Sequence, residues 1–200
     1  MTPARVEAYL DFLALSDRLK HVHRRGYTRA PDGGERPENV AEHCWTLALL
    51  AILMHEEVRF HVDLARALCM IAVHDLVEIE AGDTFAFDLA GLATQAERER
   101  AAADLVFATL PADMGARLRG LWEEFEAGET AEARFAMACD RTGGFLQQVL
   151  TGGRGWAEGG GVTREASKRR MDPARNVDPA FDDLLRALYE RAHAGRMLLA

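Results

Sequence analysis

Four side chains of this 200-residue chain could together bind a divalent metal ion: His43, His74, Asp75 and Asp140. They lie in or directly after three apolar runs that read as helices, where ionisable residues seldom occur unless they are paired or bind a ligand. Imidazole and carboxylate are the usual protein ligands of such ions, and two carboxylates balance the charge of one divalent cation. If the four converge, the ion could activate water and orient a phosphoryl oxygen. The pattern therefore predicts a metal-dependent hydrolase using Mn, Co, Mg, Zn, Fe or Ni.

Each piece of this pattern is weak when taken alone. A His-Asp dipeptide is common, and a single histidine on an apolar face is more often a core residue with a hydrogen-bond partner. The recurrence of ionisable residues in three apolar runs is what favours a shared site. The remaining histidines are expected on the surface, because they lie at helix ends or among polar residues: His21, His23, His55, His61 and His193.

Two further carboxylates follow His74 and could take part in catalysis. Glu78 lies four residues after His74, on the same face if the helix continues, and could transfer a proton to or from the reacting oxygens. Asp83 follows Gly82 at a break in the chain, where it could hold the attacking water. The alternatives are an exposed carboxylate for Glu78 and a turn-capping role for Asp83.

Arg24, Arg25 and Tyr27 are candidate substrate-binding residues. Arginine binds phosphate bidentately, so either arginine could face the metal site and hold a phosphoryl group. The alternative is a favourable interaction of both arginines with the C-terminal dipole of the preceding helix. Tyr27 could stack on a base or sugar, or pack on the core.

Helix signals dominate the chain, and runs of alternating β-branched and polar residues are absent. We therefore predict an all-α fold with helices packed orthogonally rather than as a bundle. Residues 24–36 and the glycine-rich stretch 152–161 are predicted to be loops, the second a linker in which Trp156 could cover a pocket. The predicted helices span about 3–19, 40–55, 64–76, 92–110, 113–127, 131–150, 163–171 and 179–198.

Composition excludes several classes of partner. The net charge of −8 disfavours a nucleic-acid polymer or an anionic membrane surface, while a metal and arginines could still attract a small anion. No apolar stretch approaches the ~20 residues needed to cross a bilayer. Cys44, Cys69 and Cys139 lack CxxC spacing and lie in apolar runs, so we expect buried, reduced thiols and a cytoplasmic location.

Three segments, taken in order, resemble the motifs of the HD-domain phosphohydrolases. They are Glu38–His43, His74–Glu78 with Gly82-Asp83, and Ala138–Asp140. The resemblance covers about residues 10–150 and is nearest to 5'-deoxynucleotidases, which remove phosphate from deoxynucleoside monophosphates. It implies a single HD domain over 1–200, with a core at about 10–150 and a C-terminal helical extension at about 161–198.

The resemblance also implies roles. His43, His74, Asp75 and Asp140 would be the metal ligands, with Glu78 and Asp83 assisting proton transfer and water placement. Arg24 or Arg25 would contact the phosphate, and Tyr27 would take the place of an aromatic residue that senses the sugar. A homodimer is implied because members of the family are generally dimers.

Two glycines depart from the family pattern. Gly143 and Gly144 lie inside the helix that carries Asp140, where glycine costs roughly 1 kcal/mol relative to alanine. Either the backbone packs closely there or the substrate pocket is remodelled. We expect a phosphomonoesterase acting on nucleoside 5'-monophosphates. The alternatives are a phosphatase for another small phosphoester and a non-catalytic HD module that binds a nucleotide.

Overall fold

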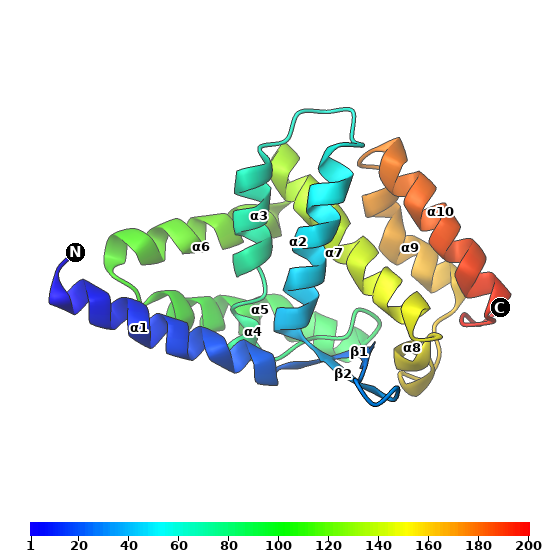
Figure 1. Cartoon of the computed structure of the whole chain (residues 1–200), viewed down its shortest axis with the longest axis horizontal. Helices are drawn as coiled ribbons and strands as arrows, with labels where there is room; N and C mark the ends of the chain where they lie inside the picture. Colours follow the sequence, from blue (N-terminus) through cyan, green and yellow to red (C-terminus); the bar gives the residue numbers. More distant parts are fainter.

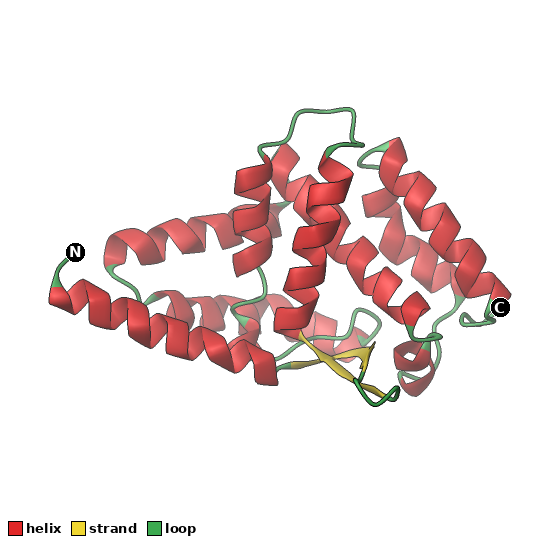
Figure 2. Ribbon diagram, in the orientation of Figure 1, coloured by secondary structure: helices red, strands yellow, loops and turns green.

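The computed structural model describes residues 1–200 and is almost entirely helical, with one small antiparallel hairpin (Figure 1, Figure 2). This confirms the predicted all-α class. The elements in chain order are α1 (Pro3–Asp17), a 3₁₀ helix η1 (Arg18–His21), β1 (His23–Arg29), β2 (Glu35–Asn39), α2 (Val40–His55), α3 (Leu64–Val73), α4 (Glu78–Ala81), α5 (Leu89–Phe107), α6 (Ala112–Ala127), α7 (Ala131–Leu150), α8 (Arg154–Glu158), α9 (Arg164–Arg175) and α10 (Pro179–Ala194).

Helices α2, α3 and α7 pack against one another at the centre, and Figure 1 shows α2 and α3 side by side with α7 running diagonally behind them. Their apolar faces form the core, with Leu47, Met70 and Phe135 fully buried. Removing side chains of this size from water contributes about 1.5–3 kcal/mol each. The central helices are thus held firmly enough to position polar groups between them.

Local capping sets where these helices begin. The Asn39 side chain accepts from the Glu42 backbone N–H, and the Glu42 carboxylate accepts from the Asn39 backbone N–H, which is a capping box at the start of α2. Thr130 caps α7 in the same way, by accepting from the Ala133 backbone N–H at 3.1 Å. Gly128 ends α6 with φ +63°, a conformation that glycine adopts without strain.

Residues 24–36 are not the loop that we predicted. Most of them belong to the β1–β2 hairpin, in which Tyr27 pairs with Pro37 and the turn passes through Gly33 at φ +85°. The strands carry no long alternating pattern in the sequence. Contacts with distant parts of the chain stabilise them instead. Side-chain amides of α7 donate to the Arg25 carbonyl at 2.8 Å and to the Tyr27 carbonyl, so a helix distant in sequence holds the hairpin in place.

Helix α3 ends three residues earlier than predicted. His74 is its C-terminal cap, and Asp75 to Val77 form a turn that leads into the separate short helix α4. Within the turn, the Glu78 N–H donates to the Asp75 carbonyl at 3.0 Å. The spacing argument from a continuous helix is therefore wrong for Glu78, whose position depends on this turn.

The C-terminal part also differs from the prediction. The stretch 152–161 contains α8, and its Trp156 is buried and packs on Phe145 with ring centroids 5.0 Å apart. Helices α9 and α10 pack on α7, and α10 ends at Ala194 rather than near residue 198. This stretch is therefore an ordered part of the fold instead of a linker.

The predictions for the remaining histidines are mostly met, whereas the prediction for the cysteines is not. Four of the five remaining histidines are exposed, while His55 is half-buried and hydrogen-bonds the Val62 carbonyl at 3.2 Å. All three cysteines are free, but the prediction of three buried thiols is wrong because Cys69 is exposed and Cys44 is half-buried. None of the helices combines the length and the apolar character that a membrane span requires.

Gly143 has a packing role that can be tested. A Cβ at this position would lie 2.3 Å from Leu47 Cδ2. Leu47 belongs to α2 and is fully buried where α2 packs against α7. Overpacking of this kind costs about 1–3 kcal/mol, so we expect Gly143→Ala to lower the free energy of unfolding in urea denaturation by that amount. Gly120 of α6 has open space around it, and Gly120→Ala should raise the free energy by up to ~1 kcal/mol. Equal effects of the two changes would contradict close packing at Gly143.

Candidate functional site

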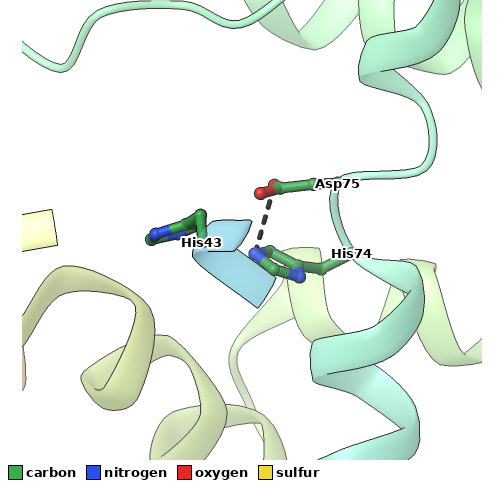
Figure 3. A group of neighbouring side chains, drawn as sticks. All are labelled: His43, His74 and Asp75. Carbon is green, nitrogen blue, oxygen red and sulfur yellow. Dashed lines mark ion pairs between the residues drawn. The ribbon is translucent and has the colours of Figure 1, made fainter. Parts of the chain in front are cut away.

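Three of the four predicted metal ligands, His43, His74 and Asp75, form one group where α2 meets the end of α3, and Asp140 of α7 lies beside His43. His43 lies in the first turns of α2, and its Nε2 is 3.0 Å from Asp140 Oδ1 of α7. His74 Nε2 lies 3.1 Å from Asp75 Oδ1. Figure 3 shows His43, His74 and Asp75 grouped together, and one ligand atom from each of them lies within 4.8 Å of the others.

His74 is fixed in one tautomer. Its Nδ1 lies 2.9 Å from the Ile71 carbonyl oxygen, which can only accept, so Nδ1 carries the proton. Nε2 is therefore the nitrogen that can offer a lone pair to a metal ion, and that atom is buried without a hydrogen-bond partner. A backbone carbonyl that orients a metal-binding histidine in this way is a recurrent feature of metal sites.

His43 also has an unsatisfied nitrogen. The residue is fully buried, Nε2 faces Asp140, and Nδ1 has no partner. Burial lowers the pKa of His43, Arg24 acts in the same direction, and Asp140 opposes them. The ring is therefore kept neutral, as a metal ligand must be.

The donor set fits a divalent ion. Two neighbouring ligands that each lie roughly 2.1 Å from an ion at right angles are about 3 Å apart, and both nitrogen–oxygen separations match this spacing. Two neutral imidazoles and two carboxylates together offset the charge of one divalent cation. The unpartnered His74 Nε2 would otherwise cost free energy in a buried site.

Neighbouring groups hold the Asp140 carboxyl in its ionised form. Desolvation by the surrounding protein would raise its pKa, but the hydrogen bond from His43 Nε2 and the positive charge of Arg24 hold the pKa well below the usual range. Asp75 is partly open, with 13% of its side chain exposed. The Asp140 side chain is 21% exposed, so neither carboxylate is fully enclosed.

Glu78 and Asp83 lie beside these ligands, and their pKa values are raised, whereas that of Asp140 is lowered. Burial raises the pKa of Glu78 well above its usual value, and the nearby Asp75 and Asp83 add to the effect. Burial also raises the pKa of Asp83, although Arg24 opposes it. Glu78 Oε2 is buried without a hydrogen-bond partner, which suits a carboxyl group that carries a proton.

Arg24, not Arg25, reaches the carboxylates. Arg24 Nη1 lies 3.5 Å from both Asp75 Oδ2 and Asp83 Oδ1. Arg24 Nε lies 3.8 Å from Glu38 Oε2. Arg25 is exposed, and its guanidinium lies over the Phe85 ring, 5.5 Å from the centroid. The alternation of β1 explains this difference, since successive side chains of a strand point to opposite faces.

Tyr27 lies farther from the metal ligands. Its hydroxyl donates to Glu158 of α8, and the Arg154 guanidinium lies 3.9 Å from its ring centroid. It lines a shallower hollow beside the main cavity, together with Arg25, Asp83 and Phe85. A direct role for Tyr27 in sensing a sugar stays a prediction.

A cavity of about 370 Å³ opens onto the ligands and extends along α7. This volume lies in the usual range of small-molecule sites. Sequence reasoning assigned no role to several residues of its wall, because only the tertiary structure brings them there: Glu38, Phe85, Glu99, Arg141, Gln148 and Arg170.

Glu38 and Gln148 carry signals that could have pointed to them. Glu38 is buried, and its burial raises its pKa to about 7 even though Arg24 opposes the shift. Gln148 is a buried amide in an apolar part of α7, a context that requires partners. It donates to the Arg25 carbonyl at 2.8 Å and accepts from the Trp156 N–H at 3.2 Å, so it fixes both β1 and α8 at the cavity.

Comparison with known proteins places this geometry in a family. A family model described as HD domain matches residues 16–178. The human and bovine proteins named 5'-deoxynucleotidase HDDC2 are 33% and 32% identical over 138 residues, which is 69% of this chain. The matched region spans about 65% of the length of these curated relatives.

Solved structures agree with that match. A protein from Magnetospirillum magnetotacticum, described as a predicted metal-dependent phosphohydrolase, superposes with a TM-score of 0.87 at 38% identity. The match covers 98% of this chain and 97% of that one. A conserved hypothetical protein from Pyrococcus furiosus shares the fold, with a TM-score of 0.61 at 20% identity, 90% of this chain and 99% of its own.

Metal binding at His43, His74, Asp75 and Asp140 should stabilise the folded chain. At a Mn²⁺ concentration about 100 times the dissociation constant, binding adds about 2.7 kcal/mol, which raises Tm by about 5–10 °C in a chain of this size. Asp140→Asn should lose most of this rise in thermal denaturation, because it removes a ligand charge at constant shape. Asp104→Asn, at an exposed carboxylate of α5, is the matched control. An equal rise in both variants would show that the ion binds elsewhere.

Proposed function

The chain belongs to the HD-domain family of metal-dependent phosphohydrolases, and on that premise we propose that it hydrolyses phosphomonoesters of (deoxy)nucleoside 5'-monophosphates. We assign His43, His74, Asp75 and Asp140 as the ligands of one divalent ion. The observation that carries the proposal is the grouping of two neutral imidazoles with two carboxylates at the wall of a cavity next to Arg24.

The nucleotide part of the proposal is supported by the relatives named 5'-deoxynucleotidase. A cavity of about 370 Å³ has room for a ligand larger than phosphate alone. Its wall joins the charged end at Asp75 to apolar groups such as Phe85 and Met171. A substrate with a phosphoryl group and an apolar body matches that distribution.

When bound, a divalent ion supplies an activated water and polarises the phosphoryl oxygens. The chain itself binds the phosphoryl group through Arg24, whose planar guanidinium can donate to two oxygens at once. Arg24 lies among Asp75, Asp83 and Glu38 and so is oriented before substrate arrives. Such preorganised donors stabilise the charge that develops in phosphoryl transfer.

Glu78 and Asp83 divide the proton transfers in this proposal. The raised pKa of Glu78 leaves a proton on its buried carboxyl, and Oε2 can donate it to the leaving ester oxygen. Asp83 lies next to Arg24, where its carboxylate can accept a hydrogen bond from the attacking water. Gly82 at φ +75° turns the chain so that Asp83 faces Arg24.

Phosphate release from a panel of nucleoside monophosphates, with added Mn²⁺, Co²⁺, Mg²⁺ or Zn²⁺, tests the proposal. We expect Arg24→Gln to lower kcat/KM by about 10²–10³-fold, the usual effect of losing a donor to the transition state. Arg25→Gln, one residue away on the exposed face, should have a much smaller effect and is the control. Asp140→Ala should abolish turnover while the fold is retained.

Three outcomes would contradict this account in different ways. Unchanged turnover in Asp140→Ala would refute the metal-dependent mechanism. Turnover of small phosphoesters without turnover of nucleotides would favour the alternative substrate class. Tight nucleotide binding without hydrolysis under every metal would identify a non-catalytic binding module.

We also propose that the chain forms a homodimer through the α2 stripe, which we define as Trp45, Leu49, Ile52 and Leu53. These residues follow the spacing of one helical face, yet all four are exposed. Trp45 has 66% of its surface and Leu53 has 68% in contact with solvent. A continuous apolar stripe of this kind favours burial against a partner.

Sedimentation velocity measures the proposed association. The unaltered protein should sediment as a dimer, and Trp45→Glu should sediment as a monomer because a charge cannot be buried in the apolar contact. Leu105→Glu changes an equally exposed leucine on α5, outside the α2 stripe, and should leave the dimer intact. A monomer at all concentrations for the unaltered protein would rule the dimer out.

A further inference from the structure

Two arginines line the cavity on its α7–α9 side without a carboxylate partner. Arg141 follows the metal-ligand candidate Asp140 on α7, and Arg170 lies on α9, which packs along α7 (Figure 1). The Arg141 guanidinium donates through Nη1 to the Arg170 backbone carbonyl at 2.9 Å. This bond fixes Arg141 against α9 and uses one of its five N–H donors.

Two other arginines of α9 have carboxylate partners. Arg169 lies 3.7 Å from Glu165 at the outer surface, and the half-buried Arg175 pairs with Asp182. Arg170, which faces the cavity, forms no ion pair, and neither does Arg141. Both arginines are half-buried, line the same cavity and are linked by the Arg141 contact with the Arg170 backbone. Two like charges therefore lie at one part of the wall, where a bound anion would offset their repulsion.

The adjacent carboxylate in the chain already has a partner. Asp140 Oδ1 faces His43 Nε2 at 3.0 Å. The amides nearby are also engaged, since Gln147 donates to the Tyr27 carbonyl and Gln148 to the Arg25 carbonyl. The free donors on this part of the wall thus belong to the arginine pair.

Gly144 leaves open space in the cavity beside Arg24. It lies four residues after Asp140 and three after Arg141, and it lines the cavity. A Cβ at this position would meet only Arg24 Nη2, at 3.9 Å. A larger side chain would project between the Arg24 end and the Arg141 end, so this glycine leaves space for a substrate that reaches both.

We propose that Arg141 and Arg170 form a second anion-binding subsite, so that the preferred substrates are phosphomonoesters that carry a further phosphate or carboxylate. The inference rests on the proposed function, because the phosphoryl group to be removed occupies the Arg24 end. Guanidinium groups bind both kinds of anion bidentately, which makes the shared chemistry an oxyanion.

Matched pairs of substrates distinguish the two sources of the anion. One pair is glycerol 3-phosphate and 3-phosphoglycerate, which differ by a carboxylate. The other is 2'-deoxyadenosine 5'-monophosphate and 2'-deoxyadenosine 3',5'-bisphosphate, which differ by a phosphate. We expect the doubly anionic member of at least one pair to have about tenfold higher kcat/KM and lower Kd, the effect of one charge-assisted hydrogen bond.

Arg170→Gln is the decisive variant, because it removes the guanidinium but keeps the backbone carbonyl that Arg141 contacts. This variant should bring the ratio of kcat/KM values within a substrate pair close to one. Arg169→Gln makes the same change of charge one residue away, at the outer surface, and should leave the preference as in the unaltered protein. The pair that loses its preference in Arg170→Gln identifies the anion.

Kd values from isothermal titration calorimetry separate failure of this inference from failure of the proposed function. Absence of phosphate release from every compound would overturn the proposed function, while an Arg170-dependent difference in Kd would still support the subsite. Hydrolysis with no preference in either pair, or a preference that survives in Arg170→Gln, would overturn the subsite. Equal losses in Arg170→Gln and Arg169→Gln would also overturn it, since a general charge effect would then explain the result.

Discussion

The hydrogen bond from His74 Nδ1 to the Ile71 carbonyl constrains the whole site. It fixes the tautomer, directs the bare Nε2 toward Asp75, and uses a carbonyl that the end of α3 leaves free. Had α3 continued to residue 76, as its apolar pattern suggested, that carbonyl would have been available to the helix backbone. The early end of the helix is thus part of the site, because it supplies an acceptor for the ring and brings Asp75 close to His43.

The second constraint is the close approach of α2 and α7. Gly143 has no side chain, so Leu47 can pack against the α7 backbone, and the same approach sets His43 within 3.0 Å of Asp140. Charge then differentiates the carboxylates. His43 holds Asp140 ionised, whereas Glu78, which lacks such a partner, retains a proton through burial. Two roles for chemically similar groups thus follow from where each lies relative to the imidazoles and Arg24.

Much of this arrangement could be predicted from the sequence where short-range signals decide the outcome. Asn39 and Thr130 begin their helices with side-chain caps, and Gly128 ends one. Ionisable residues inside apolar runs pointed to His43, His74 and Asp140, since burial of such groups needs partners. Comparison with known proteins confirms the resemblance to HD-domain phosphohydrolases and the all-α class, and the four predicted ligands lie together, although their role in binding an ion stays a prediction.

The features that could not be predicted from the sequence depend on long-range contacts. The hairpin holding Arg24 and Tyr27 depends on amides of α7 more than 100 residues away, so its strands carry little signal of their own. The choice between Arg24 and Arg25 depends on the register of that hairpin. Trp156 read as part of a linker because glycines surround it, yet Phe145 and Gln148 order it. Arg170 carries no signal in the sequence, because only the packing of α9 on α7 brings it to the cavity.

The most direct test of the central claim is the position of the ion. A crystal grown with Mn²⁺ and measured at the manganese absorption edge should show one anomalous peak per chain within bonding distance of His43, His74, Asp75 and Asp140. A peak elsewhere, or none at full loading, would contradict the account, as would a structure in which these imidazoles and carboxylates point away from one another.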